Sequence, residues 1–259
     1  MILGFIGTGV ITEAIVRGLI KSDYPVEQIF VSTRSAAVSS ALAALSPKVC
    51  VCDNNQAIAD GSDILFLAVL PQDAQSVISA LSVRTGTQIV SLIATVSIDN
   101  IRAWSGSDGP IFRAIPLPSV AELTGVSVIF PPSSQIEAMF NALGRAVCVT
   151  SIEEFDAYAV ASAMMGLYFG LSETVTQWLC DQGNDYPDAR AYMAGTFQAL
   201  ANTATASTGE SFDTLRVRHS TPGGLNEQMF AVFDAKGGTS AVESACASVA
   251  TRIKGARQG

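Results

Sequence analysis

Short apolar runs alternate with stretches of helical periodicity over the first 150 residues. The runs are rich in Val, Ile and Phe, and polar or glycine-containing segments bound them, as is typical of strands. They predict strands at residues 2–6, 28–32, 49–51, 64–69, 88–92, 111–113, 126–130 and 146–149. Strands that alternate with helices indicate an α/β domain built on a parallel, doubly wound sheet.

The pattern changes near residue 150, and no strand-like run follows. Ser151 precedes acidic residues at the start of a long apolar segment, which is typical of a helix N-terminus. We predict helices from 152 to about 180, from the turn at 184–187 to about 207, and in two segments after the loop at 220–224. The chain should therefore have an α/β domain at 1–150 and an all-helical domain at 151–259.

The predicted helix at 152–180 is too apolar to have one face in solvent. The whole chain agrees with this, because charged residues make up only 15% of it and hydrophobic residues 49%. A second copy of the chain would cover such a helix. We therefore predict a homodimer, or a higher oligomer, formed through the helical half.

A turn with two closely spaced glycines joins the first strand to the first helix. Glycines let the backbone approach a diphosphate, and a helix N-terminus offers unpaired N–H groups and a positive dipole end. We predict that Gly7, Thr8, Gly9, Val10 and Ile11 bind a dinucleotide. The motif is imperfect, since Thr12 stands where a third small residue is expected, and glycine turns also join strands to helices without a ligand.

The end of the second predicted strand bears on which dinucleotide binds. Thr33 and Arg34 follow this strand, and no carboxylate occurs from residue 28 to residue 52. Sites for NAD usually place an Asp or Glu here, whereas a guanidinium pairs with the 2′-phosphate of NADP(H). We predict NADP(H), with an ordinary surface arginine as the alternative interpretation of Arg34.

Charge and cysteine content favour a cytoplasmic enzyme. The net charge of −8 argues against nucleic acid and anionic membranes as partners. The five scattered cysteines are typical of reduced thiols, and we expect no metal site. The N-terminus lacks the basic lead-in of a signal peptide, and no apolar stretch is long enough to span a membrane.

Four stretches share their motifs and their spacing with one known family. They are Ile6-Gly7-Thr8-Gly9 with Ala14-Ile15 and Gly18-Leu19, Leu67-Ala68-Val69-Leu70-Pro71-Gln72, Arg113-Ala114-Ile115-Pro116, and Ser220-Thr221-Pro222-Gly223-Gly224. With them, the chain resembles the pyrroline-5-carboxylate reductase family along nearly its whole length. The resemblance implies a Rossmann-type NADP(H)-binding domain followed by an all-helical dimerisation domain.

The resemblance also implies cofactor-binding positions beyond the glycine turn. It places Asn55 near the adenosine ribose. It assigns Ala68, Val69, Pro71 and Ala94, in the loops after the fourth and fifth strands, to the cofactor as well.

The substrate-side motifs depart from the family pattern. Leu70 replaces a lysine, Leu117 replaces an asparagine, and Asn226 replaces a threonine that family members place beside the imine nitrogen. Met164 and Met165 replace small residues of the helix that forms the dimer. They belong either to core or dimer packing, or to a more apolar substrate pocket, which would imply a bulkier or less polar imine.

Asn226 is the candidate catalytic residue. A protonated imine is already a strong electrophile, so a reductase mainly has to align it with the hydride donor. The amide of Asn226 can donate one hydrogen bond and accept another. Ketone reduction needs a firm proton donor, and the long helix lacks the lysine that β-hydroxyacid dehydrogenases use there.

The loop before the penultimate helix holds the other candidate substrate residues. Gly223, Gly224 and Leu225 could present backbone N–H groups to a substrate carboxylate, or could form a simple helix entry. His219, the only histidine, is a candidate proton donor or carboxylate ligand, or else an ordinary helix-end histidine.

These observations predict an NADPH-dependent reductase of a C=N bond in a small cyclic imine carboxylate. One alternative is an NADP(H)-binding sensor or scaffold without this catalysis. Another is an NADP-linked oxidoreductase that uses a different carrier, such as a deazaflavin.

Overall fold

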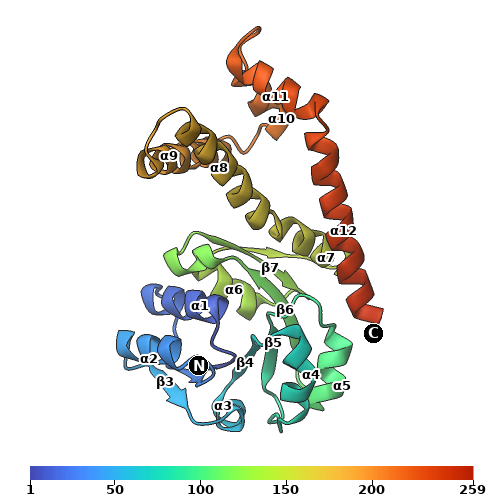
Figure 1. Ribbon diagram of the computed structural model, residues 1–259. Coiled ribbons are helices and arrows are strands. Elements are labelled where there is room, and N and C mark those ends of the chain that lie inside the picture. Colours follow the sequence, from blue (N-terminus) through green and yellow to red (C-terminus); the bar gives the residue numbers. More distant parts are fainter. Residues whose placement is uncertain (259) are drawn as a thin grey trace. The chain divides into compact units, whose positions relative to one another are not determined.

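The computed structural model describes the backbone of residues 1–258. These residues form two compact units (Figure 1). The first unit holds residues 1–162 together with the chain from Ala250 onward, and the second holds residues 163–249. Strands give way to helices alone between Cys148 and Ile152, close to the predicted change at residue 150.

An eight-stranded sheet forms the centre of the first unit. Its strands are β1 (Ile2–Ile6), β2 (Gln28–Ser32), β3 (Val49–Cys52), β4 (Ile64–Leu67), β5 (Gln88–Ser91), β6 (Ile111–Pro116), β7 (Gly125–Phe130) and β8 (Gly144–Cys148). They lie in the order β3-β2-β1-β4-β5-β6-β7-β8. The eight predicted strands are confirmed, and the order reverses between β1 and β4 as in a doubly wound fold.

The expectation of a wholly parallel sheet is wrong for the last two strands. β7 pairs antiparallel with β6, and β8 runs parallel to β7. The segment between β6 and β7 contains only the short 3₁₀-helix η1 (Pro118–Glu122). A parallel crossover needs a dozen or more residues, so this connection is too short to carry β7 back to a parallel start.

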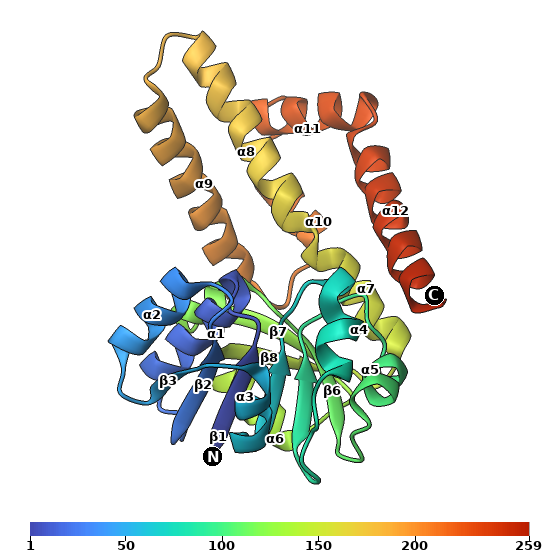
Figure 2. The same ribbon diagram turned by 60° about the horizontal axis from the view of Figure 1, so that its bottom comes forward.

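Helices cover both faces of the sheet (Figures 1 and 2). They are α1 (Val10–Lys21), α2 (Ala36–Leu45), α3 (Asn55–Gly61), α4 (Pro71–Ser79), α5 (Ile98–Ser105) and α6 (Ser134–Ala142). Buried side chains of α1, α2 and α6 share one core cluster, in which the rings of Phe5 and Phe66 stack 4.4 Å apart. Those of α3, α4 and α5 form the core on the other face. This double cover leaves the strand ends as the edge where a ligand can bind.

The remaining elements are helical, as predicted. They are α7 (Ile152–Ser162), α8 (Met164–Asp181), α9 (Tyr186–Ala206), α10 (Phe212–Arg218), α11 (Leu225–Ala235) and α12 (Gly238–Gln258). Ser151 caps α7 as expected, because its hydroxyl accepts from the Glu154 N–H while the Glu154 carboxylate accepts from the Ser151 N–H. No helix within residues 1–258 combines the length and apolar character that a membrane span requires.

Two details of the helical half differ from the prediction. The single helix expected at 152–180 is two helices, α7 and α8, separated at Ala163. The short helix α10 was not predicted, because Gly209 and its polar neighbours mask the start that Ser211 caps through the Thr214 N–H.

Candidate functional site

A cavity of ≈ 380 Å³ lies at the carboxyl ends of β1, β2 and β4 in the first unit. It is lined by Ile6, Gly7, Ser32, Thr33, Arg34, Asp53, Asn54, Asn55, Val69 and Val77. Five of the predicted cofactor residues are among them: Gly7, Thr33, Arg34, Asn55 and Val69. The cavity is at the point where the strand order reverses, which is where doubly wound sheets bind their ligands.

Gly7 forms the sharp turn at the end of β1. Its φ of +98° belongs to the left-handed region that favours glycine, and a Cβ there would lie 2.4 Å from the backbone oxygen of Ala68. The Gly7 N–H donates to the Ser32 hydroxyl over 3.1 Å, and the buried Thr12 hydroxyl donates to the Gly7 carbonyl over 2.6 Å. Thr12 is thus the residue that holds the turn, which explains why a small residue is absent at its position.

Thr8 and Ser32 tie the turn to the end of β2. The Thr8 hydroxyl donates to the Ser32 carbonyl over 2.6 Å, and the Thr8 side chain is buried. Thr8 was predicted to bind the cofactor. In the structure, the Thr8 side chain contacts β2 and does not line the cavity. Ser32 was not singled out, although a hydroxyl at the last position of β2 was visible.

The start of α1 is open toward a ligand. Gly9 is the N-cap of α1, no side chain caps it, and a Cβ at Gly9 would meet nothing within 4 Å. Val10 is exposed and Ile11 half-buried. The first N–H groups of a helix have no partner inside the helix, and the dipole adds positive potential there. This end of α1 therefore suits a diphosphate.

Arg34 already has a partner in the structure. Its Nη2 lies 2.7 Å from Oδ2 of Asp73, and the two side chains are 51% and 36% exposed. Asp73 belongs to the first turn of α4, directly after the predicted cofactor residues Ala68 and Pro71. Asp73 could not be predicted from the sequence, because only the order of the strands brings α4 next to the end of β2.

Ala94, in the loop after β5, is tied to a buried arginine. Nη2 of Arg113 donates to the Ala94 carbonyl over 2.5 Å, and Arg113 itself, on β6, is fully buried. The guanidinium stacks on the Phe155 ring at 4.4 Å, and its Nη1 lies 3.9 Å from a carboxylate oxygen of Asp156. Arg113 thus joins the loop after β5 to α7, and the Ala94 side chain stays exposed at the carboxyl edge.

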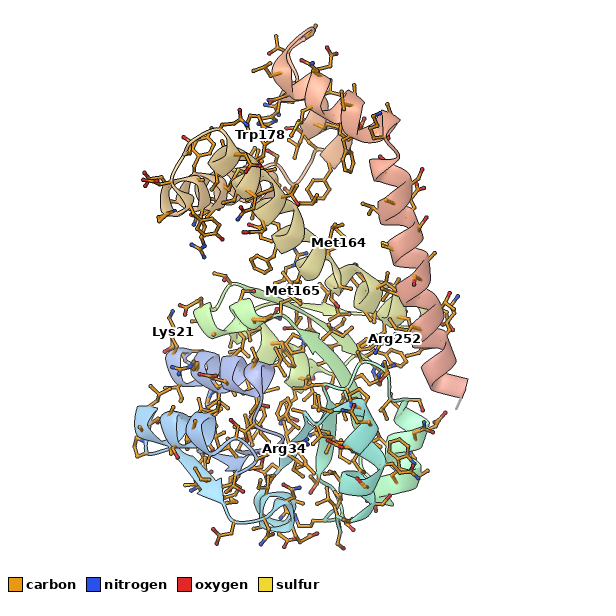
Figure 3. The ribbon with its side chains drawn as sticks, in the orientation of Figure 1. Lys21, Arg34, Met164, Met165, Trp178 and Arg252 are labelled. Atoms are coloured by element: carbon orange, nitrogen blue, oxygen red, sulfur yellow. The ribbon has the colours of Figure 1, made fainter. Side chains whose placement is uncertain are left out.

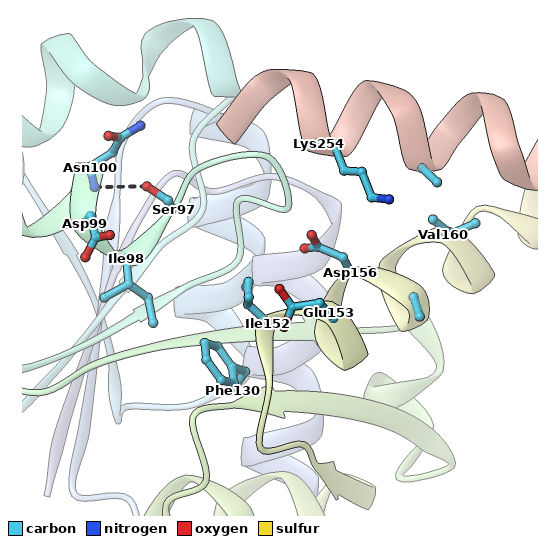
Figure 4. Close-up of a pocket in the computed structure, with 12 residues that line it drawn as sticks. Ser97, Ile98, Asp99, Asn100, Phe130, Ile152, Glu153, Asp156, Val160 and Lys254 are labelled. Atoms are coloured by element: carbon cyan, nitrogen blue, oxygen red, sulfur yellow. Dashed lines mark hydrogen bonds between the residues drawn. The ribbon is translucent and has the colours of Figure 1, made fainter. Parts of the chain in front are cut away.

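A larger cavity of ≈ 920 Å³ lies elsewhere in the first unit, beside α7 and the last turns of α12 (Figure 4). Asp99, Glu153 and Asp156 line it, and Lys254 faces Asp156 from α12. Three carboxylates against one ammonium do not suit a diphosphate. The dinucleotide site is therefore better placed at the glycine turn.

The predicted substrate residues belong to the second unit, and several of their polar groups are hydrogen-bonded within it. Asn226 Nδ2 donates to the His219 carbonyl over 2.7 Å. The Gly223 N–H donates to the Glu227 carboxylate over 2.7 Å, and the Gly224 N–H donates to the Thr221 carbonyl over 2.7 Å. The two glycine donors proposed for a substrate carboxylate are thus engaged inside the chain. Glu227, at the third position of α11, was not singled out by the sequence analysis.

His219 ends α10 with its ring turned back onto the helix. Its Nδ1 lies 2.8 Å from the Leu215 carbonyl. Because a carbonyl only accepts, Nδ1 carries the hydrogen, and Nε2 is the nitrogen that can accept one. His219 also lines an apolar cavity of ≈ 380 Å³ together with Tyr168, Phe197 and Phe212.

Apolar side chains of the second unit are exposed in the single chain. Met164 and Met165 lie at the start of α8 (Figure 3), and each is 43% exposed. Leu225, the first residue of α11, is 83% exposed. Within one chain, these residues do not form a core. Grouped exposed apolar side chains of this kind mark an interaction surface.

Two family models match the chain. Residues 2–95 match one described as NADP oxidoreductase coenzyme F420-dependent, and residues 153–256 match one described as pyrroline-5-carboxylate reductase dimerisation. The pyrroline-5-carboxylate reductase of Haemophilus influenzae is 28% identical over 261 residues, which cover 97% of this chain and 96% of the relative. That of Pseudomonas aeruginosa is 26% identical and covers 96% of this chain and 94% of the relative.

Solved structures share the fold. The 1-pyrroline-5-carboxylate reductase of Streptococcus pyogenes matches with a TM-score of 0.85 and 20% identity, covering 98% of each chain. The pyrroline carboxylate reductase of Plasmodium falciparum, solved with NADP bound, matches with a TM-score of 0.82 and 17% identity, covering 98% of this chain and 97% of the other.

Proposed function

The chain belongs to the pyrroline-5-carboxylate reductase family, and from this we propose that it is an NADPH-dependent reductase of a C=N bond in a small cyclic imine. The observation that carries the proposal is the glycine turn at Gly7 and Gly9, with an open helix N-terminus beside it, in a chain whose second half matches the family's dimerisation domain. A pyrroline-5-carboxylate-like imine carboxylate is the first substrate class to test, since the matched relatives carry that name.

We assign one task in this reaction to each unit. When bound, NADPH would supply a hydride to the carbon of the protonated imine while the C=N π electrons move to nitrogen, which yields a neutral secondary amine and NADP⁺. The turn at Gly7 and the start of α1 would hold the diphosphate, and Arg34 would pair with the 2′-phosphate. Since Asn226 Nδ2 is bound to the His219 carbonyl, its Oδ1 is the end of the amide that accepts a hydrogen bond from the iminium N–H.

The enzyme is proposed to act as a homodimer formed through the helical unit. Exposed apolar side chains on α8 and α11 support this, including Phe169, Leu225 and Met229. The match of residues 153–256 to a dimerisation domain agrees. We also propose a cytoplasmic location, which suits five cysteines that are all free.

The description of the first family model supports a second candidate function. The first unit alone would suit an NADP oxidoreductase that uses coenzyme F420. The helical half favours imine reduction, because its match is to pyrroline-5-carboxylate reductases. Hydride transfer between NADPH and a deazaflavin, without imine turnover, would support the second function.

The proposed function predicts imine-dependent oxidation of NADPH. Purified protein is mixed with NADPH and pyrroline-5-carboxylate, piperideine-carboxylate or thiazoline-carboxylate, and absorbance at the nicotinamide band is followed. Asn226→Ala should lower kcat/KM on the order of 10- to 100-fold, because the iminium loses its orienting acceptor. Asn226→Thr, which installs the residue found in the family, should retain most activity.

Gln228→Ala is the matched control, since Gln228 is an exposed neighbour on α11. Equal activities for Asn226→Ala and Gln228→Ala would exclude the proposed role of Asn226. NADPH binding without oxidation by any imine would instead favour the sensor or scaffold.

Glu227 should weaken the binding of a carboxylate-bearing substrate. The Glu227 carboxylate already accepts a hydrogen bond from the Gly223 N–H at the start of α11. A substrate carboxylate would therefore find this donor engaged, and the negative charge of Glu227 would repel it. Glu227→Gln should lower KM for the imine carboxylate by about three- to tenfold and leave KM for 1-pyrroline, which has no carboxylate, unchanged. Steady-state kinetics with the two substrates tests this, with the exposed Glu243→Gln as control; an equal change for both substrates would contradict it.

A further inference from the structure

The arginine expected to select the phosphorylated cofactor is neutralised by a carboxylate. Arg34 follows β2 and lines the cavity at the glycine turn, and its guanidinium is paired with Asp73. The residues that line this cavity also include the anion Asp53. The local charge around Arg34 is therefore negative, although the sequence at the end of β2 suggested a positive site.

The backbone of Asp73 is fixed at the start of α4. Asp73 occupies the third position of this helix, after the N-cap Leu70 and Pro71, and its backbone N–H donates to the Leu70 carbonyl over 3.0 Å. A carboxylate in the first turn of a helix is stabilised by the helix dipole. A ligand that binds Arg34 therefore has to compete with a carboxylate that belongs to this helix turn.

We propose that Asp73 is a specificity-determining residue that lowers the preference of this site for NADPH over NADH. The inference rests on the proposed function, because it assigns the adenosine end of the cofactor to this cavity. The Arg34–Asp73 pair acts as a selector, because its carboxylate competes for Arg34 only with the phosphorylated cofactor.

For NADPH, the 2′-phosphate has to take Arg34 from Asp73. The phosphate carries more charge than a carboxylate and offers three oxygens, so it can displace Asp73 from Arg34. The nearby Asp73 carboxylate then repels the phosphate, and part of the attraction to Arg34 is lost. NADPH is consequently bound less tightly than it would be by Arg34 alone.

NADH does not compete with Asp73 for Arg34. Its ribose 2′-hydroxyl is a donor without charge, whereas the 2′-phosphate of NADPH is an anion. The Arg34–Asp73 pair therefore stays intact when NADH binds. Asp73 weakens the binding of NADPH and leaves the binding of NADH unchanged.

The alternative is that the ion pair serves only to join α4 to the end of β2. Its side chains are partly exposed, and exposed pairs contribute little to stability. The two interpretations differ in what they predict for cofactor binding. Only a selector changes the ratio of the two dissociation constants when Asp73 is replaced.

Nucleotide binding to the full-length protein tests the proposal without turnover. Dissociation constants for NADPH, NADH and the fragments 2′,5′-ADP and 5′-ADP are measured by calorimetry for the wild type and for Asp73→Asn. We expect Asp73→Asn to bind NADPH and 2′,5′-ADP about three- to tenfold more tightly and NADH no more tightly, and the gain to shrink as salt is raised. Arg34→Ala should reverse the preference toward NADH.

Glu122→Gln is the matched control variant. Glu122 pairs with Lys21 over 2.5 Å on another part of the first unit, with side chains 72% and 52% exposed. It should leave all four dissociation constants unchanged. An unchanged NADPH-to-NADH ratio in Asp73→Asn would overturn the inference alone, whereas no binding of either dinucleotide to the wild type would overturn the proposed function and the inference with it.

Discussion

Replacing Gly7 by alanine should weaken cofactor binding roughly 100-fold and also destabilise the first unit. The left-handed backbone of Gly7 and the 2.4 Å approach of the Ala68 oxygen leave no room for a methyl group. Forcing a side chain there costs about 1–3 kcal/mol of unfolding free energy. Displacing the turn also removes N–H contacts to the diphosphate, and two contacts of about 1.5 kcal/mol each correspond to roughly 100-fold in the NADPH dissociation constant.

Gly9→Ala separates the two effects in the same turn. The backbone of Gly9 is ordinary and its Cβ direction is open, so this variant should lose less than about 1 kcal/mol of stability. Its methyl group still points where the diphosphate approaches, and NADPH binding should weaken. Urea denaturation and calorimetry on both variants test this, and a Gly7→Ala protein as stable as the wild type would contradict the strained turn.

Arg113→Met should cause the largest loss of stability. It removes the cation beside the buried Asp156, the donor to the Ala94 carbonyl and the contact with the Phe155 ring. Breaking a buried ion pair from one side costs about 3–5 kcal/mol, because the remaining charge is left uncompensated. In denaturant unfolding, Arg113→Met should have a lower midpoint concentration than the wild type.

A double variant and an exposed arginine provide the controls. Arg113→Met combined with Asp156→Asn should recover part of the loss, since the buried carboxylate is gone. Arg84→Met removes a cation 3.5 Å from Asp63 in an exposed pair and should change stability by less than about 1 kcal/mol. Equal losses for Arg113→Met and Arg84→Met would contradict the assigned role of Arg113.

Most of the fold could be predicted because its strands are buried on both faces. The run Ile64 to Leu67 is apolar throughout and is fully enclosed in the structure, so composition alone marked it as a central strand. The direction of β7 could not be predicted in the same way. It depends on the length of one connection and on pairing with β6, and neither changes the apolar pattern of the strand.

The candidate site was predictable where one segment forms it, and less so where several meet. Gly7 and Gly9 lie within one strand–turn–helix unit, so their spacing in the sequence was enough to predict the dinucleotide-binding turn. The pairing of Arg34 with Asp73 joins residues 39 positions apart, and it follows only from the neighbouring positions of β2, β1 and β4. The role of Thr12 was also hidden, because a threonine in place of a small residue is meaningful only once its hydroxyl is seen on the Gly7 carbonyl.

The return of the chain to the first unit at Ala250 affects how that unit could be expressed alone. A stop codon after Ser162 would delete Ile253, whose side chain is only 5% exposed, and would leave an uncovered apolar patch on the truncated product. A soluble fragment for crystallisation or isotope labelling would instead need Ser162 spliced to Ala250 through a designed linker.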